Sequence, residues 1–131
     1  MRSRLRDERG ASAVEFGMIV PILLVLLLGI IEFGHAFQVQ GTLSAAAREG
    51  ARRMALQNDT TDARDAVRDA AGSLDPAITD AQISIDPASC PIAADTDTDV
   101  IVTIEYPMPF LTGLFGASVD LTGRGVMRCQ G

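Results

Sequence analysis

Residues 9–37 read RGASAVEFGMIVPILLVLLLGIIEFGHAF, and this stretch decides the fold. Its centre, residues 16–31, carries no charged side chain. About 20 helical residues cross the hydrocarbon core of a bilayer, so the stretch is long enough for one membrane-spanning helix if Glu15 and Glu32 lie near the two interfaces. Pro21 stands where it would kink that helix or loosen it locally.

The charges around the apolar stretch predict its orientation. Four arginines precede it: Arg2, Arg4, Arg6 and Arg9. Basic residues stay on the cytoplasmic side of a membrane, so the N-terminus is expected inside the cell and the C-terminal part outside the cytoplasm. We therefore expect a single-pass protein of the cytoplasmic (inner) membrane. Residues 1–10 would be a basic cytoplasmic leader and residues 11–37 the transmembrane helix.

A cleaved secretory signal is the alternative interpretation of the same stretch. The arginines would form its basic region, and Gly34-His35-Ala36 would be a small-x-small site that releases a secreted domain near Ala36. Against this, Glu15 and Glu32 interrupt the two ends of the apolar run, which is also long for a signal. The pattern favours the membrane anchor.

Glu15 has two interpretations. A carboxylate at the mouth of a membrane helix is costly unless it pairs or reaches the interface. Ser12 and Glu15 have the spacing of a capping box, in which two side chains satisfy the free amides at a helix start. In that interpretation Glu15 is structural only. The other interpretation depends on the residues that precede it.

A basic leader that ends in Gly10, then four residues, then Glu15 and the aromatic Phe16 directly before an apolar helix resembles a type IV prepilin processing site. The resemblance implies that a membrane aspartic peptidase cuts between Gly10 and Ala11, which makes Glu15 the fifth residue of the mature chain. It also implies that Glu15 neutralises the terminal amine of a neighbouring subunit in a filament. Two buried opposite charges would there offset each other's desolvation.

Two further blocks, residues 32–34 (EFG) and 45–52 (AAAREGAR), narrow the resemblance to the TadE-like family of the tight-adherence (Flp) pilus system. The resemblance extends over residues 9–53. This chain departs from the family pattern at Phe16, where family members often have a Tyr. The resemblance implies a minor pilin or pseudopilin whose partners are a prepilin peptidase, other pilin-like subunits and the inner-membrane assembly platform. The residues it assigns to helix packing are Glu32, Ala47, Arg48, Glu49, Gly50 and Ala51.

The helical pattern continues beyond the membrane stretch. Apolar residues recur every three to four positions from Val39 to Met54, so residues 38–57 are expected to extend the same helix. Glu49 can pair with an arginine on the following turn. The small residues within 45–51 permit close approach, either by a neighbouring helix or by the protein's own sheet. Both alternatives require burial, and the sequence leaves both open.

Residues 58–131 are expected to form a small extracytoplasmic domain. Thr60 or Thr61 would cap a second helix that ends near Ala71 and, with a thin apolar stripe, lies at the surface. Alternation of apolar and polar residues predicts three strands, at residues 82–86, 100–106 and 119–129. The expected fold is therefore α+β, with a long N-terminal transmembrane helix, a short helix and a three-stranded antiparallel sheet.

Cys90 and Cys129 would lie at the same end of such a sheet, where a disulfide can form. A disulfide is expected outside the cytoplasm, and two buried free thiols are the alternative. Residues 107–117 (PMPFLTGLFGA) are expected to form an apolar loop. This loop would cover the sheet, touch lipid headgroups or meet a partner, and the sequence leaves these three open.

No residue pattern in the chain indicates catalysis. Residues 95–99 (DTDTD) begin like a calcium loop, but Val100 and Tyr106 stand where that loop needs Gly and Glu, so a solvated hairpin loop is favoured. His35, the only histidine, is more simply an interfacial partner of Glu32. We expect no enzyme, no cofactor, no metal and no small-molecule substrate.

The charge balance also argues against nucleic acid. Beyond Phe37 the chain has 7 arginines and 13 acidic residues, whereas phosphate binding needs clustered cations. The function expected is that of a structural pilin-like subunit. The alternatives are an uncleaved single-pass anchor that presents an extracytoplasmic binding domain, and the secreted domain released near Ala36.

Overall fold

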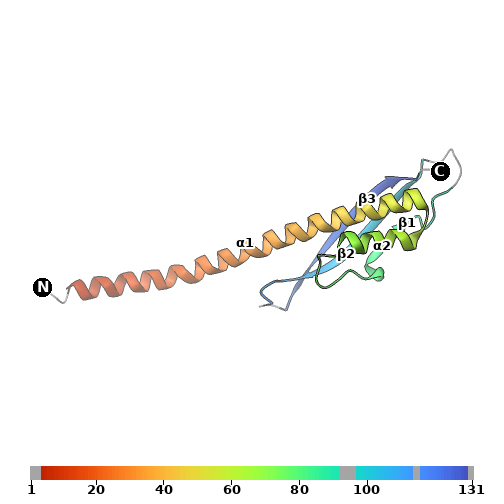
Figure 1. The fold of residues 1–131 in the computed structure, drawn as a ribbon. Helices are drawn as coiled ribbons and strands as arrows, with labels where there is room; N and C mark the ends of the chain where they lie inside the picture. The colour runs from red at the N-terminus through yellow and green to blue at the C-terminus, as the bar shows by residue number, and fades with distance from the viewer. Residues whose placement is uncertain (1–3, 92–96, 114–115, 130–131) are drawn as a thin grey trace. The chain divides into compact units, whose positions relative to one another are not determined.

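A computed structural model describes residues 4–91, 97–113 and 116–129, with side chains from residue 8 onward (Figure 1). The chain divides into two compact units, Met1–His35 and Ala36–Gly131. Its elements are α1 (Arg4–Gln57), α2 (Thr60–Ala70), a short 3-10 helix η1 (Asp80–Gln82), β1 (Ile83–Asp86), β2 (Asp99–Pro109) and β3 (Ser118–Arg128). The predicted α+β fold, with a long N-terminal apolar helix, a short helix and a three-stranded antiparallel sheet, is confirmed.

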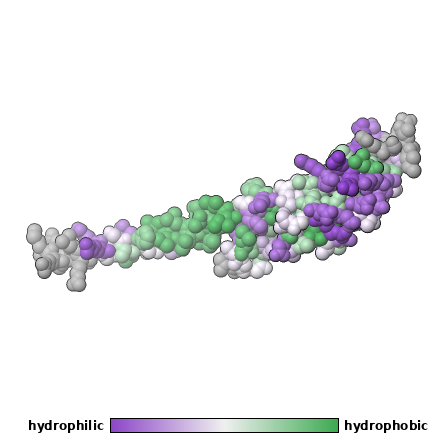
Figure 2. Space-filling view, in the orientation of Figure 1, coloured by the Kyte–Doolittle hydropathy of each residue, from purple (hydrophilic) through white to green (hydrophobic). Residues whose placement is uncertain are grey.

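The first unit consists of the N-terminal part of α1. Its large apolar side chains from Val14 to Phe33, apart from the half-buried Val20, are exposed on every side of the helix. Figure 2 shows one face of this hydrophobic stretch. A helix that is apolar all round is stable only in a protein interior or a membrane. Within the described residues, α1 alone is long and apolar enough to cross a membrane, and none of its most apolar window is buried.

The start of α1 differs from the prediction. One of the two interpretations of Glu15 placed Ser12 at the helix start, in a capping box with Glu15, but α1 already includes Arg4. Ser12 lies inside the helix, and its hydroxyl donates to the carbonyl oxygen of Glu8 at 3.1 Å. A serine within a helix commonly bonds back to the preceding turn in this way. The capping-box interpretation is therefore wrong for this chain.

In the second unit the three strands form a meander in the order β1-β2-β3. Strands β2 and β3 pair along their whole length, from Asp99 opposite Arg128 to Pro109 opposite Ser118. The prediction ended the second strand at Tyr106 and assigned residues 107–117 to a loop, whereas β2 continues to Pro109.

The hydrogen-bond pattern explains why β2 can contain two prolines. The Cys129 N–H donates to the Thr98 carbonyl oxygen at 2.9 Å, so by alternation the even-numbered residues of β2 bond to β3. Pro107 and Pro109 are odd-numbered and turn their nitrogens toward the β1 side, where β1 pairs only with residues 101–104. No ladder hydrogen bond is lost there, which is the position in a sheet that proline tolerates.

One face of the sheet is covered by the C-terminal part of α1 and by α2. The buried side chains of β2 alternate along the strand and pack against Leu43, Ala47 and Met54 of α1; they are Val100, Val102, Ile104, Tyr106 and Met108. Helix α2 adds Ala63 and Val67 to this core, and its other residues are exposed or half-buried, so the helix lies at the surface on a thin apolar stripe as predicted.

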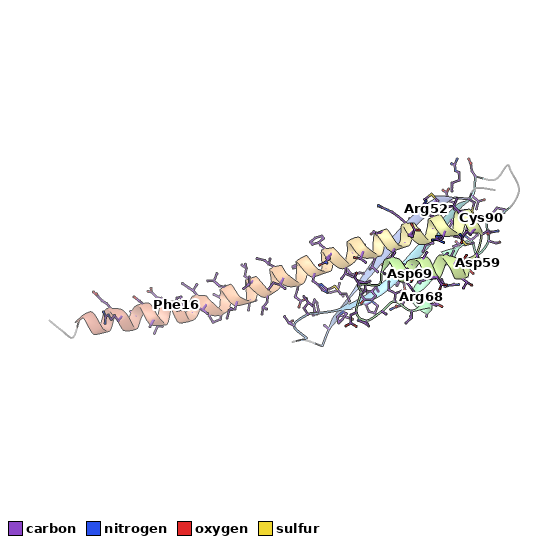
Figure 3. The ribbon with its side chains drawn as sticks, in the orientation of Figure 1. Phe16, Arg52, Asp59, Arg68, Asp69 and Cys90 are labelled. Atoms are coloured by element: carbon purple, nitrogen blue, oxygen red, sulfur yellow. A yellow bond between two sulfur atoms is a disulfide. The ribbon has the colours of Figure 1, made fainter. Side chains whose placement is uncertain are left out.

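The N-terminus of α2 is capped by a different residue from the two we expected. Asp59, not Thr60 or Thr61, is the N-cap, and its carboxylate accepts from the Thr61 N–H at 2.7 Å and the Asp62 N–H at 3.2 Å. A carboxylate at this position also interacts favourably with the helix dipole. Figure 3 shows Asp59 at the end of α2 near Cys90, with Arg68 farther along the helix.

Candidate processing site and membrane span

The predicted cleavage point, between Gly10 and Ala11, lies inside α1 and is exposed. A Cβ atom added to Gly10 would meet nothing within 4 Å outside the helix's own local backbone. The Ser12-to-Glu8 hydrogen bond crosses the Gly10–Ala11 peptide bond. A protease that binds this bond in an extended conformation must therefore unwind the surrounding turn.

Glu15 and Phe16 follow one turn after this point. Both side chains are exposed, and Phe16 projects from α1 in Figure 3. Glu15 is the last charged residue before the uncharged residues 16–31. The predicted cleavage point, the carboxylate and the uncharged run are thus consecutive on a single helix.

At the other end of the apolar run, Glu32 and His35 are both half-buried. His35 is the last residue of the first unit, and Ala36 begins the second. Phe37, in the first turn of α1 that belongs to the second unit, is 75% exposed. An aromatic side chain at the end of an apolar helix is typical of a membrane interface.

Apart from the exposed Ala45, the small residues of the 45–52 block lie against the protein's own sheet and second helix. Ala47 and Ala51 are fully buried. A Cβ atom added to Gly50 would lie 2.4 Å from Cγ2 of Val67 in α2. A Cβ atom added to Gly125 of β3 would lie 2.4 Å from the carbonyl carbon of Ala47. These close approaches use the small residues inside one subunit.

The charged residues of the same block stay at the surface. Arg48 is exposed. Glu49 is half-buried and lies 3.8 Å from Arg52 and 3.7 Å from Arg53, on the next turn. Pairs at this spacing on a helix surface each contribute a few tenths of a kcal/mol, roughly 0.2–0.5. They help to maintain the helix.

A disulfide joins Cys90 to Cys129, as expected from the strand order. The sequence argument missed Asn58, whose side chain makes two hydrogen bonds to the backbone of Cys90. Asn58 has a φ of 54°, in the left-handed region. An Asn directly after a helix is a recognised signal for such a C-terminal cap, so the sequence did contain the clue.

The calcium-like segment falls partly outside the described residues, because residues 92–96 are not among them. Asp97 is described and lies 3.3 Å from Arg128. In the parts of the chain that the structure describes, no three His, Cys, Asp or Glu side chains are grouped so that they could hold a metal ion.

These features agree with a comparison of the chain with protein families. Residues 10–52 match the model of the family described as TadE-like protein. The TadE-like segment begins at Gly10 and ends at Arg52, about a third of the chain. It covers the predicted cleavage point, the candidate span and the buried small residues of the 45–52 block.

Neither the curated proteins nor the solved structures contain a match to the chain. The residues after Arg52, which include α2 and the whole sheet, lie outside the TadE-like match.

Proposed function

We propose that this protein is a minor pilin or pseudopilin of a Tad (Flp) pilus or a related secretion apparatus, and that a prepilin peptidase cleaves it after Gly10. The observation that carries the proposal is the order of features along one helix. The TadE-like match begins at Gly10, Glu15 follows, and an apolar surface with no protein covering it comes next.

The proposed location is the cytoplasmic membrane, with the N-terminus inside and the second unit outside. The arginines before Gly10 favour this orientation, since basic residues stay on the cytoplasmic side. The disulfide between Cys90 and Cys129 supports it independently. Disulfides persist in oxidising compartments and are rare in the cytosol. After assembly the subunit would leave the membrane for the pilus.

Glu15 is the residue that would act in assembly. Cleavage creates an ammonium group on Ala11, at the cytoplasmic end of the span. Neither this amine nor the Glu15 carboxylate is stable alone in an apolar filament core, because each would lose its hydration. A subunit arriving next to another can pair its amine with that neighbour's Glu15, which removes both penalties. The partners would be other pilin-like subunits and the inner-membrane assembly platform.

Intact mass of the protein from cells with a working Tad system tests the cleavage. The expected N-terminus is Ala11, and Gly10→Ala should leave the arginine leader attached. Because an added Cβ at Gly10 meets nothing, loss of cleavage cannot be ascribed to a clash. Gly17→Ala is the matched control, since Gly17 is also in α1 with open space around it. It should be processed normally.

Glu15→Gln separates assembly from cleavage. The variant keeps the size of the side chain but cannot neutralise an amine. We expect a processed protein that stays in the membrane fraction and is depleted from sheared pili. A leader retained in wild-type protein would instead support the uncleaved anchor, and an N-terminus near Phe37 the secreted domain.

A further inference from the structure

The turn of α1 that contains the Gly10–Ala11 bond is held only by local interactions. Every residue from Glu8 to Ile19 is exposed, so these side chains do not pack against other elements of the structure (Figure 1, the red end of α1). Most of the stability of a protein helix comes from such packing, and a helix without it is marginal in water. Opening of this turn therefore depends on its own residues.

Two residues weaken the turn. After proline, glycine is the least favourable residue inside a helix. A Cβ atom added to Gly10 would meet nothing within 4 Å, so close packing does not require a glycine there. The Ser12 hydroxyl donates to the Glu8 carbonyl oxygen at 3.1 Å, the same oxygen that accepts from the Ser12 N–H in an α-helix. A serine hydroxyl that competes with the backbone in this way slightly destabilises the helix.

The part of α1 that follows cannot open as easily. Residues 16–31 carry no charge and form the proposed span. In the hydrocarbon of a membrane no water replaces a broken backbone hydrogen bond, so each lost bond is costly. Opening is therefore confined to the residues before Phe16, which Figure 3 labels, and it includes the bond between Gly10 and Ala11.

We propose that opening of this turn limits the rate of processing, and that Ser12 raises this rate by keeping the turn easy to open. A peptidase that binds an extended chain acts only on the open form, so its apparent affinity rises with the open population. Hydrolysis then adds water across the bond and leaves a carboxylate on Gly10 and an amine on Ala11. Ser12 acts on the helix and not on these reacting atoms. The inference rests on the proposed cleavage after Gly10.

The test is the cleavage of the full-length chain in phospholipid bilayers by a purified prepilin peptidase. Ser12→Ala removes the hydroxyl and favours the helix, so kcat/KM should fall about twofold. Ala13→Gly weakens the same turn while Gly10 and Glu15 stay in place, and kcat/KM should rise about fivefold. Ser12→Thr keeps a hydroxyl that can bond to the same carbonyl oxygen, so this variant should be cleaved at least as fast as wild type.

Thr42→Ala is the matched control. The Thr42 hydroxyl donates to the Gln38 carbonyl oxygen at 3.1 Å, which is the same kind of bond in the second unit, far along the chain from the cleavage point. Its loss should leave kcat/KM unchanged.

Amide hydrogen exchange of residues 8–14 in the uncleaved proteins measures the opening without the peptidase. Exchange should slow about twofold in Ser12→Ala and accelerate about fivefold in Ala13→Gly. Cleavage rates that follow these exchange rates support the inference.

Cleavage of all the variants at one rate overturns the inference alone. So does a slower cleavage of Ser12→Ala with unchanged amide exchange, because Ser12 would then contact the peptidase directly and not act through the helix. A wild-type chain that stays uncleaved refutes the proposed cleavage, and this inference with it.

Discussion

The side chain of Asn58 holds the backbone of Cys90 at two points. Its Nδ2 donates to the Cys90 carbonyl oxygen at 3.3 Å, and its Oδ1 accepts from the Cys90 N–H at 2.6 Å. The Asn58 N–H also donates to the carbonyl oxygen of Met54 at 2.9 Å, which closes the end of α1. One residue therefore ends the long helix and positions the segment that carries half of the disulfide.

Replacing Asn58 by Gly and by Ala should separate the hydrogen bonds from the backbone conformation. Glycine accepts a positive φ without strain, so Asn58→Gly loses only the hydrogen bonds, about 2 kcal/mol. Asn58→Ala should lose about 1 kcal/mol more, because an alanine is strained in the left-handed region. The measurement is denaturant unfolding of the full chain in detergent, followed by the fluorescence of Tyr106. Equal losses for the two variants would contradict this account.

The glycines of β3 should tolerate no side chain. A Cβ atom at Gly125 would lie 2.4 Å from the backbone of Ala47, and backbone cannot move aside as a side chain can. Gly125→Ala should therefore cost about 3 kcal/mol. Gly41→Ala is the control, since nothing lies within 4 Å of it and alanine favours a helix by about 1 kcal/mol. Stabilities measured as above should move in opposite directions, and a neutral Gly125→Ala would refute the close packing.

The parts of the fold that the sequence predicted correctly depend on local periodicity. The uncharged run at residues 16–31 predicted the long helix, and the alternation of apolar and polar residues predicted the three strands. The buried face of β2 shows why the second strand was predicted too short. Met108 continues the alternation of Val100 to Tyr106, but the flanking Pro107 and Pro109 read as the start of a loop. The sheet tolerates these prolines because β1 pairs with β2 only as far as Ile104, and the segment's own sequence does not show this.

In the TadE-like segment, the sequence predicted the features around Gly10 better than the contacts of the 45–52 block. The order of Gly10, Glu15 and the apolar run is local and was visible in the sequence. The sequence did not show which part of the protein contacts the small residues of the 45–52 block. Gly125, which fits against Ala47, lies far along the chain, and no local pattern links a glycine in one strand to an alanine in a helix. Tertiary packing decides between such alternatives.

Removing the disulfide should destabilise the second unit substantially. Cys90 and Cys129 lie 39 positions apart in the sequence, and closing a loop of that size contributes about 4 kcal/mol in the chain-entropy model. Replacing both cysteines by alanine should reduce the unfolding free energy by about that amount. Dithiothreitol should reduce the unfolding free energy of the wild-type protein by a similar amount, whereas it should leave that of the double variant unchanged. A loss under about 1 kcal/mol would mean that the unfolded chain is scarcely restrained by this bond.

Tyr106 should titrate at an unusually high pH. Its side chain is 2% exposed, and its hydroxyl donates to the Pro76 carbonyl oxygen at 2.8 Å. Burial raises the pKa of the phenol above its usual 10.0, and the negative charge of Asp75 raises it further. The chain has one tyrosine, no tryptophan and no lysine, so tyrosinate absorbance near 295 nm reports this group alone. Asp75→Asn should lower the midpoint part of the way toward 10.0.

The same shift makes stability depend on pH in the alkaline range. Below pH 10 the phenol of Tyr106 is neutral in both states and the stability is fully present. As the pH rises above 10, the unfolded chain ionises first, so the folded state loses stability until the folded pKa is passed. Tyr106→Phe should cost about 1 kcal/mol at neutral pH but remove this alkaline loss. A folded-state midpoint at or below 10.0, or an equal alkaline loss in the Phe variant, would show that the phenol is not held neutral by its buried position.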